Sequence, residues 1–173
     1  DCKVAWDLNF IALRYFNAAG AGWKDLADPA ALNLIPLVEK ALAQGKSPVV
    51  FGDGYPTPDG SCIRDYVHVL DLAAAHLVAL DALRSGEVTE GIFNVGTGQG
   101  SSVFEVMESV RSASGQEFEA VVASPRAGDP AVLVADASAI RDALGWRATL
   151  GLDDIVQSSW DARGNAGRAS TDS

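Results

Sequence analysis

Short apolar runs alternate with amphipathic stretches along this chain, a pattern typical of an α/β protein. Residues 10–16 (FIALRYF) carry Arg14 as their only charge, which predicts a parallel strand buried on both faces. Val49–Phe51 and residues 91–96 (GIFNVG) predict two further short strands. A fourth is expected over residues 117–123, where apolar and polar positions partly alternate.

Apolar residues at three- and four-residue spacing predict helices between these strands. Pro29 suits the first turn of one, and Ser102 with Glu105 forms the capping box of another. Asp136 is expected to cap a short helix that Gly145 ends, with Trp146 packed beneath it. The predicted helical segments are residues 29–42, 71–83, 102–112, 136–144 and 152–160.

The stretch from residue 51 to residue 72 concentrates turn formers, charge and the start of a helix. Residues 52–60 (GDGYPTPDG) predict an ordered loop, and Arg64 follows where regular structure resumes. A guanidinium held there can bind a phosphate through two parallel hydrogen bonds. The alternative is an ion pair between Arg64 and Asp65 or another surface carboxylate.

A second arginine, Arg126, lies in a similar turn-rich segment (SPRAGDP), and two such arginines could converge on one diphosphate. Taken singly, Arg126 and Asp129 are most simply explained by a local ion pair between them. Tyr15, Phe16 and Asn17 end the first strand, and ligands of open parallel sheets gather beyond the carboxyl ends of strands. The two aromatic residues could also be ordinary core residues.

Composition limits the possible partners of the 173-residue chain. It is 48% hydrophobic and 21% charged, as expected of one globular domain, and its net charge is −10. A surface for nucleic acid or an anionic membrane is therefore not expected, because phosphates would be repelled over most of the protein. A small phosphorylated ligand needs only local arginines and backbone N–H groups.

Cys2 and Cys62 form no C-x-x-C pair, which suggests neither a zinc site nor a disulfide framework and favours a reducing, cytoplasmic setting. No run approaches the length of a membrane span, and no signal peptide is recognised. The chain begins with Asp and reads as a fragment that starts in mid-fold. Residues 164–173 contain no large apolar residue and are expected to be disordered.

The glycines at positions 96, 98 and 100 invite comparison with a dinucleotide fingerprint. The pattern G-x-G-x-G-S lacks the third glycine at the required position, and no second strand with an acidic end follows. We therefore expect these glycines to form a tight turn between a strand and a helix.

The run FGDGYPTPDGSCIRDYVHVLDLAAAH resembles the corresponding segment of UDP-glucose 4-epimerases, which are extended short-chain dehydrogenase/reductases. Further matches occur in the family's order at LRYFNAAGA, NLIP, FNVGTG, PRAGD and LGW, and together they cover roughly residues 9–160. The resemblance implies an α/β fold in which residues 1–163 are the C-terminal, nucleotide-sugar-binding portion with the last strands of the Rossmann sheet. It also implies that an N-terminal half, which binds most of the NAD, is absent from the chain.

The resemblance also implies roles for individual residues. Tyr15 and Phe16 would wall the nicotinamide region of NAD, and Asn17 would bind the phosphates of the nucleotide-sugar. Asn33 and Leu34 match positions on its diphosphate and uracil side, although a helix-start residue and a core leucine would look the same. The expected substrate-binding residues are Asn17, Asn33, Leu34, Phe51, Arg64, Tyr66, Val103, Arg126 and Asp129.

Epimerases of this family oxidise the C4 hydroxyl of the sugar with bound NAD and return hydride to the opposite face. That chemistry uses a glycine-rich fingerprint, a Ser or Thr, and a Tyr-x-x-x-Lys pair. No tyrosine here has a lysine four positions later, so no catalytic residue is assigned and the chain alone is expected to be inactive. His68 and His76 lie in apolar patterns and are expected to be core residues.

The resemblance therefore implies the UDP-sugar-binding part of a UDP-hexose 4-epimerase, an isomerase that is a homodimer when full length. The loop before residue 33 is shorter than is usual in the family, so the resemblance does not assign the sugar that the substrate carries. Three alternatives also remain: part of a related nucleotide-sugar dehydratase or decarboxylase, a non-catalytic nucleotide-sugar-binding module, and a structural fragment without a ligand.

Overall fold

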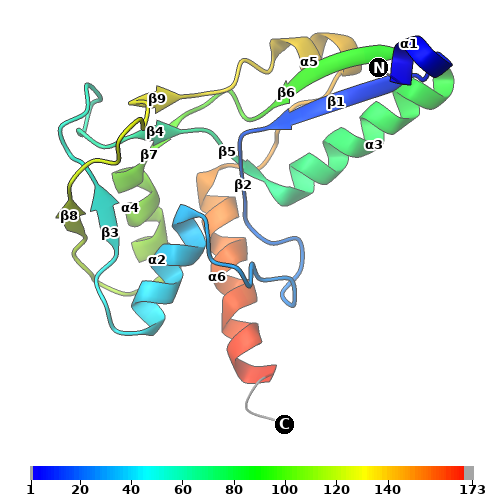
Figure 1. Ribbon diagram of the computed structural model, residues 1–173. Helices are drawn as coiled ribbons and strands as arrows, with labels where there is room; N and C mark the ends of the chain where they lie inside the picture. Colours follow the sequence, from blue (N-terminus) through cyan, green and yellow to red (C-terminus); the bar gives the residue numbers. More distant parts are fainter. Residues whose placement is uncertain (1, 170–173) are drawn as a thin grey trace.

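The computed structural model describes residues 2–169 and has the mixed α/β class that the sequence predicts. Its elements form two neighbouring groups (Figure 1): α3 and α5 flank the pair β1–β6, and α2, α4 and α6 pack together beside the shorter strands. The helices are α1 (Cys2–Trp6), α2 (Leu34–Ala43), α3 (Val69–Ser85), α4 (Val103–Ser114), α5 (Ser138–Leu144) and α6 (Leu152–Ala169).

The strands pair mostly in parallel. β1 with β6, β2 with β5, and β3 with β8 form parallel pairs, and β4 lies between antiparallel β7 and parallel β9. The short strands β2 and β5 lie between the two groups of elements (Figure 1), and each contacts both α3 and α6. The strands are β1 (Phe10–Tyr15), β2 (Asn17–Ala19), β3 (Val49–Phe51), β4 (Ile63–Arg64), β5 (Tyr66–His68), β6 (Glu90–Val95), β7 (Ser101–Ser102), β8 (Val121–Ala123) and β9 (Val132–Leu133).

Each group has its own hydrophobic core. Ile35, Met107 and Ile155 bring α2, α4 and α6 together in the first core. Phe93 and Trp146 belong to the second, between the β1–β6 pair, α3 and α5. The buried position predicted for Trp146 is thus confirmed. The two cores hold strand β5 in place between them, because Tyr66 packs in the first and Val67 in the second.

Strand β1 is less buried than predicted. Its first four residues are only half-buried, and Arg14 and Tyr15 are exposed. The reason is that, among the described residues, β1 has a partner strand on one edge only, β6. The prediction of burial on both faces is therefore wrong for this chain, although the parallel pairing itself is confirmed.

Helix α2 begins at Leu34 and not at Pro29. Asp28 Oδ1 accepts a hydrogen bond from the Ala30 N–H at 2.9 Å, and Ala31 has a φ of 46°, so the chain turns before the helix starts. Pro36 occupies the first turn of α2 in place of Pro29. Because the Asp28 carboxylate binds the Ala30 N–H and the chain turns there, the helix starts later in the sequence than predicted.

Other boundaries differ by smaller amounts. The strand predicted from residue 117 is confined to β8, and the preceding Phe118 carbonyl instead accepts a hydrogen bond from Arg111 Nε at 3.1 Å. Asp136 lies one position before the N-cap residue of α5, although its carboxylate does accept the Ser138 N–H. Gly145 ends α5 in the left-handed conformation, as predicted.

Helices α4 and α6 begin as predicted and run further. Ser102 and Glu105 form the expected capping box of α4, which continues to Ser114. Helix α6 continues to Ala169, because each added residue gains a backbone hydrogen bond once a helix has formed. Helix α6 thus extends into the segment 164–173 for which disorder is predicted, and residues 170–173 lie outside the described part of the chain.

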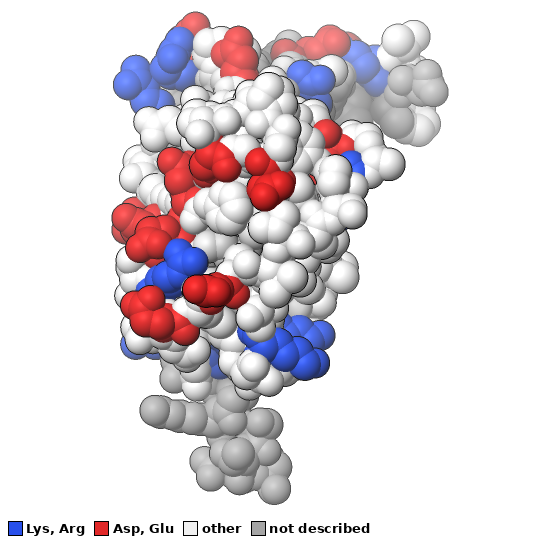
Figure 2. Space-filling view, turned by 90° about the vertical axis from the view of Figure 1, so that its left-hand side faces the viewer, with Lys and Arg blue, Asp and Glu red and all other residues white. Residues whose placement is uncertain are grey.

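Charged side chains are spread over the face shown in Figure 2. Acidic groups are scattered across its upper and middle part, and basic groups occur in small separate clusters. This face offers no continuous basic surface, in keeping with the net charge of −10. Within residues 2–169, no helix is both long and apolar enough to cross a membrane.

Candidate functional site

A cavity of about 540 Å³ opens between α2, β3, the β4–β5 segment and the first turn of α4. Its lining includes every residue that the sequence singles out for substrate binding: Asn17, Asn33, Leu34, Phe51, Arg64, Tyr66, Val103, Arg126 and Asp129. Sequence reasoning missed several apolar and small residues of the same lining, which extend it along α2 and β3: Leu32, Leu37, Val38, Ala41, Ser47, Pro48, Val49 and Cys62. We call this cavity the central pocket.

Arg64 is held firmly in the central pocket. Its side chain is 14% exposed, and Nη1 donates to the carbonyls of Ile63 and Pro130, each at 2.8 Å. Nη2 lies 3.5 Å from Asp129 Oδ1. The carboxylate beside Arg64 is thus that of Asp129 and not that of Asp65, and the carbonyl bonds fix the plane of the guanidinium.

Arg126 brings a second positive charge to the mouth of the pocket. Its guanidinium carbon lies 3.9 Å from the centroid of the Phe51 ring, a cation–π contact that orients an otherwise exposed side chain. The backbone N–H of Asp129 donates to the Arg126 carbonyl at 3.3 Å, and the Asp129 carboxylate faces Arg64. The pocket therefore combines two guanidinium groups with an apolar wall.

Tyr66 supplies a neutral phenol to the same pocket. Burial raises the pKa of Tyr66 to about 12, against the opposing effects of the Arg64 charge and a hydrogen bond with Asn17. The phenol therefore stays protonated at neutral pH and can donate a hydrogen bond beside the guanidinium of Arg64.

The loop that precedes β4 is fastened to α4 by Asp59. This carboxylate accepts hydrogen bonds from the Ser61 N–H at 2.9 Å, from Ser61 Oγ at 2.8 Å, and from Ser102 Oγ, which also caps α4. Burial alone would raise the pKa of Asp59, but the bonds from Ser102 and Ser61 lower it. Gly60 allows the tight path of this loop, since a Cβ there would lie 1.9 Å from the Asp53 carbonyl oxygen.

Asp65, between Arg64 and Tyr66 in sequence, points away from the pocket and is 1% exposed. Its Oδ1 accepts hydrogen bonds from the N–H and Oγ1 of Thr97, at 2.8 and 2.7 Å. Its Oδ2 accepts the N–H groups of Gly98 and Ala135, at 2.9 and 3.1 Å. The buried carboxylate of Asp65 thus links the β4–β5 segment to the loop of Thr97 and Gly98 and to the loop of Ala135.

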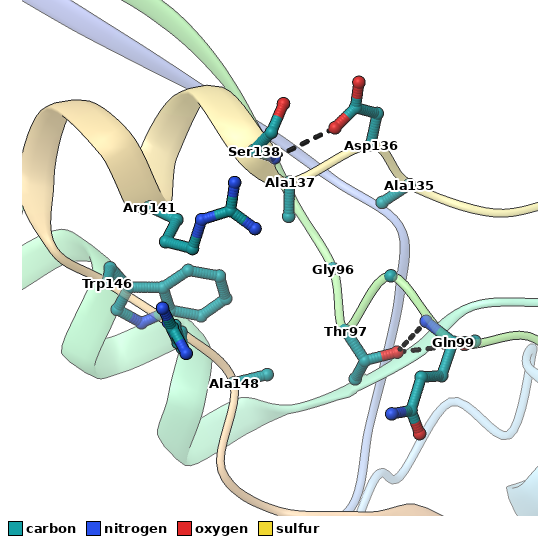
Figure 3. A pocket seen from close by; sticks show the side chains of 12 residues that line it. Gly96, Thr97, Gln99, Ala135, Asp136, Ala137, Ser138, Arg141, Trp146 and Ala148 are labelled. Atoms are coloured by element: carbon teal, nitrogen blue, oxygen red, sulfur yellow. Dashed lines mark hydrogen bonds between the residues drawn. The ribbon is translucent and has the colours of Figure 1, made fainter.

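The loop that begins at Gly96 borders a second, polar hollow of about 410 Å³, shown in Figure 3. Its turn is closed by the Gln99 N–H, which donates to Thr97 Oγ1 at 3.0 Å, and this is the tight turn that the sequence predicts ahead of α4. Arg141 points into this hollow from α5, but its Nε already pairs with Asp142 at 2.9 Å. The hollow shares no residue with the central pocket.

The two residues expected at the cofactor lie outside the central pocket. Tyr15 is half-exposed at the carboxyl end of β1, and its hydroxyl oxygen is 2.6 Å from His76 Nε2. Phe16 is half-buried, and its N–H donates to the Val95 carbonyl. His76 is exposed, so its prediction as a core residue is wrong.

His68 is buried as predicted and also caps a helix. Its Nδ1 accepts the Leu70 N–H at the start of α3, and its Nε2 lies 3.0 Å from Ser158 Oγ in α6. Because Ser158 Oγ donates to the Ile155 carbonyl and accepts the Ala21 N–H, the Nε2–H of His68 must donate to it. Protonation of Nδ1 would break the cap.

This arrangement predicts a loss of stability in mild acid. Burial lowers the pKa of His68, while the charges of Asp71 and Asp154 oppose the shift. The unfolded chain then takes up the proton first, so the stabilisation is complete above about pH 6.5 and is lost as the pH falls below it. We expect urea unfolding between about pH 7.5 and about pH 5.5 to show a steeper loss for the wild type than for His68→Asn, which keeps a capping side chain. Parallel pH profiles for the two proteins would contradict this.

Taken together, the fold and the central pocket define an α/β protein with two arginines at a cavity suited to a phosphorylated ligand. The chain belongs to the NAD dependent epimerase/dehydratase family, whose model matches residues 2–96. The resemblance drawn from the sequence motifs is thereby confirmed.

Individual relatives agree with this. The UDP-glucose 4-epimerase of Halalkalibacterium halodurans is 43% identical over 164 residues, covering 92% of this chain and 49% of the relative. That of Azospirillum brasilense is 45% identical over 168 residues, covering 93% of this chain and 48% of the relative. The chain thus spans about half the length of the curated relatives it matches.

A solved structure of the Stenotrophomonas maltophila UDP-glucose-4-epimerase, with bound NAD and formylated UDP-arabinopyranose, matches with a TM-score of 0.89 at 37% identity. The match covers 97% of this chain and 51% of that one. The Bifidobacterium longum UDP-glucose 4-epimerase in complex with NAD+ and UDP matches with a TM-score of 0.80 at 34% identity, over 96% of this chain and 51% of that one.

Proposed function

We propose that this chain is the UDP-sugar-binding part of a UDP-glucose 4-epimerase, the isomerase that interconverts UDP-glucose and UDP-galactose through a 4-keto sugar. The observation that carries the proposal is the meeting of Arg64 and Arg126 at one pocket. The relatives' names favour an epimerase over the related dehydratases and decarboxylases.

The diphosphate would lie between the two arginines. Arg64 is oriented by two backbone carbonyls and keeps further N–H groups for a ligand, and Arg126 closes the mouth from above the Phe51 ring. A diphosphate would displace or share the contact between Arg64 and Asp129, which at 3.5 Å is long for a charge-assisted hydrogen bond. Asp129 would then be available to accept from the ribose hydroxyls.

The rest of the pocket suits the other groups of the ligand. Leu34, Phe51 and Val103 offer apolar surface to the uracil ring, while Asn17 and Asn33 offer amides to the phosphates. Tyr66 adds a neutral hydroxyl donor. These are the groups that position a substrate, and they include none that the epimerase reaction needs to move a proton.

NAD would supply hydride transfer when bound. The half-exposed ring of Tyr15 and the half-buried ring of Phe16, both at the carboxyl end of β1, fit the wall of a flat nicotinamide. The chain has no glycine-rich fingerprint for the pyrophosphate, so most of the cofactor would be held by residues beyond those of this chain. We also propose a cytoplasmic homodimer for the whole enzyme; the buried free thiol of Cys62 fits a reducing compartment.

The test of the UDP site removes each arginine in turn. We expect Arg64→Ala and Arg126→Ala each to weaken UDP binding by about 1.5–3 kcal/mol, the range for hydrogen bonds to charged groups, with Arg126→Ala nearer the lower end because that side chain is exposed. Isothermal titration of UDP into the 173-residue chain measures this.

Arg84→Ala is the matched control for these variants, because Arg84 is exposed at the end of α3 and does not line the pocket. Its UDP affinity should equal that of the wild type. Unchanged affinity in both pocket variants would mean that neither arginine contacts the diphosphate.

A further inference from the structure

The contact between Tyr15 and His76 joins the end of β1 to the middle of α3 and lies outside the central pocket. The two rings are 5.5 Å apart between centroids and tilted by 59°. The Tyr15 hydroxyl oxygen is 2.6 Å from His76 Nε2, and both side chains are accessible to solvent. A short, specific bond between two exposed side chains calls for an explanation other than core packing.

The direction of this bond follows from the second nitrogen of the ring. His76 Nδ1 lies 2.7 Å from the Leu72 carbonyl oxygen, one turn earlier in α3. A carbonyl only accepts, so Nδ1 carries the proton in the neutral ring and Nε2 has a free lone pair. Tyr15 must therefore donate its hydroxyl proton to Nε2.

This direction determines what Tyr15 can offer to a ligand. With its proton committed to His76, the phenol oxygen keeps only acceptor capacity, and the ring is fixed in one orientation. The side chain is 50% exposed at the carboxyl end of a parallel strand, where ligands of such sheets bind. A group with N–H donors and a flat ring is the chemical complement, and the nicotinamide carboxamide is such a group.

We infer that His76 is a positioning residue that holds Tyr15 as a ring wall and hydrogen-bond acceptor for the nicotinamide end of NAD. This inference rests on the proposed function, because it takes the dinucleotide to lie at Tyr15. His76 itself acts only through Tyr15 and Leu72 and donates nothing to the ligand.

The hydrogen bond is tested first without any cofactor. Nitrogen-detected NMR of the 173-residue chain should show the His76 ring protonated at Nδ1 and a Tyr15 hydroxyl proton coupled to Nε2. The hydroxyl signal should vanish in His76→Phe. A His76 ring protonated at Nε2 would overturn the inference, since Tyr15 would then be the acceptor.

The second arm measures NAD affinity by the fluorescence of bound NADH. The protein used is this chain joined to the part of the Azospirillum brasilense relative that the chain does not span. Tyr15→Phe and His76→Phe should each weaken binding roughly two- to tenfold, the range of one neutral hydrogen bond, and the double variant no more than either. His76→Gln, which restores an acceptor, should recover part of the loss.

The outcomes separate the two proposals. If the fused protein binds NADH equally well with and without His76, or if the two losses add in the double variant, the positioning role is overturned and the proposed function stands. If the fused protein binds UDP but no NADH at all, the assignment of an NAD-dependent epimerase fails and the inference fails with it.

Discussion

Asp65→Asn is expected to destabilise the protein by at least about 3 kcal/mol, since hydrogen bonds to a charged group contribute about 1.5–3 kcal/mol each. In the native structure each carboxylate oxygen accepts two hydrogen bonds from loop groups, and the side chain is almost fully buried. The amide of Asn would turn an NH₂ group toward donors on one side. At least two buried N–H or O–H groups would then lose their acceptor.

The loss would be a large share of the roughly 5–15 kcal/mol that stabilises an ordinary domain. Urea unfolding followed by circular dichroism measures it, and Asp136→Asn is the matched control. Asp136 is exposed, and its carboxylate accepts the Ser138 N–H, so its replacement should have a much smaller effect. Equal unfolding midpoints for the two variants would show that the Asp65 network contributes little. UDP affinity should fall as well in Asp65→Asn, because Arg64 and Tyr66 flank this residue.

The second large effect concerns turnover. The 173-residue chain alone should not interconvert UDP-galactose and UDP-glucose even when NAD is added, because no Tyr-x-x-x-Lys pair is present to transfer the proton. Joining the chain to the missing part of the Azospirillum brasilense relative should restore turnover from an undetectable level.

A coupled assay of UDP-glucose formation measures this, and the relative's part alone is the control. Turnover by the unfused chain would contradict the proposal that this chain binds the UDP-sugar but does not catalyse its epimerisation. A fused protein that binds UDP and NADH but stays inactive would favour a non-catalytic nucleotide-sugar-binding module.

Motif resemblance could foresee which residues line the pocket because those residues lie at strand ends and in turn-rich loops. Arg64 follows a dense run of turn formers, and Arg126 lies in another, so both were expected at a surface where a phosphate can be met. The resemblance also added residues such as Val103, whose role no local pattern reveals. Periodicity alone missed the apolar residues of α2 and β3 that extend the cavity, since Ala41 and Val49 look like ordinary core positions.

Other features could not be foreseen because they depend on distant partners. In sequence, Asp65 reads as a surface carboxylate and Asp71 as the start of a helix. Both carboxylates are buried, and each accepts several hydrogen bonds from loops far along the chain. His76 lies in an apolar helical pattern, and only the structure brings Tyr15 within 2.6 Å of it. Helix α2 starts late because the Asp28 carboxylate accepts a hydrogen bond from the Ala30 N–H. This bond outweighs the preference of Pro29 for the first turn of a helix.

Strand β1 illustrates a limit of pattern reasoning of another kind. Its apolar sequence suits a central strand, but within the described residues only β6 pairs with it. Nearby large apolar side chains are correspondingly open, with Leu77 and Leu80 of α3 at 63% and 50% exposure. The apolar sequence of β1 is typical of a strand inside a larger sheet than the one described here. This agrees with a chain that spans about half the length of the relatives it matches.

The most direct test of the central claim compares UDP with uridine as ligands of the 173-residue chain by isothermal titration. If Arg64 and Arg126 grip a diphosphate, UDP should bind more tightly than uridine by at least about 3 kcal/mol, the sum of two charge-assisted contacts at the low end of their range. That difference should shrink by about half in Arg64→Ala. Equal affinities for UDP and uridine in the wild type would contradict the account.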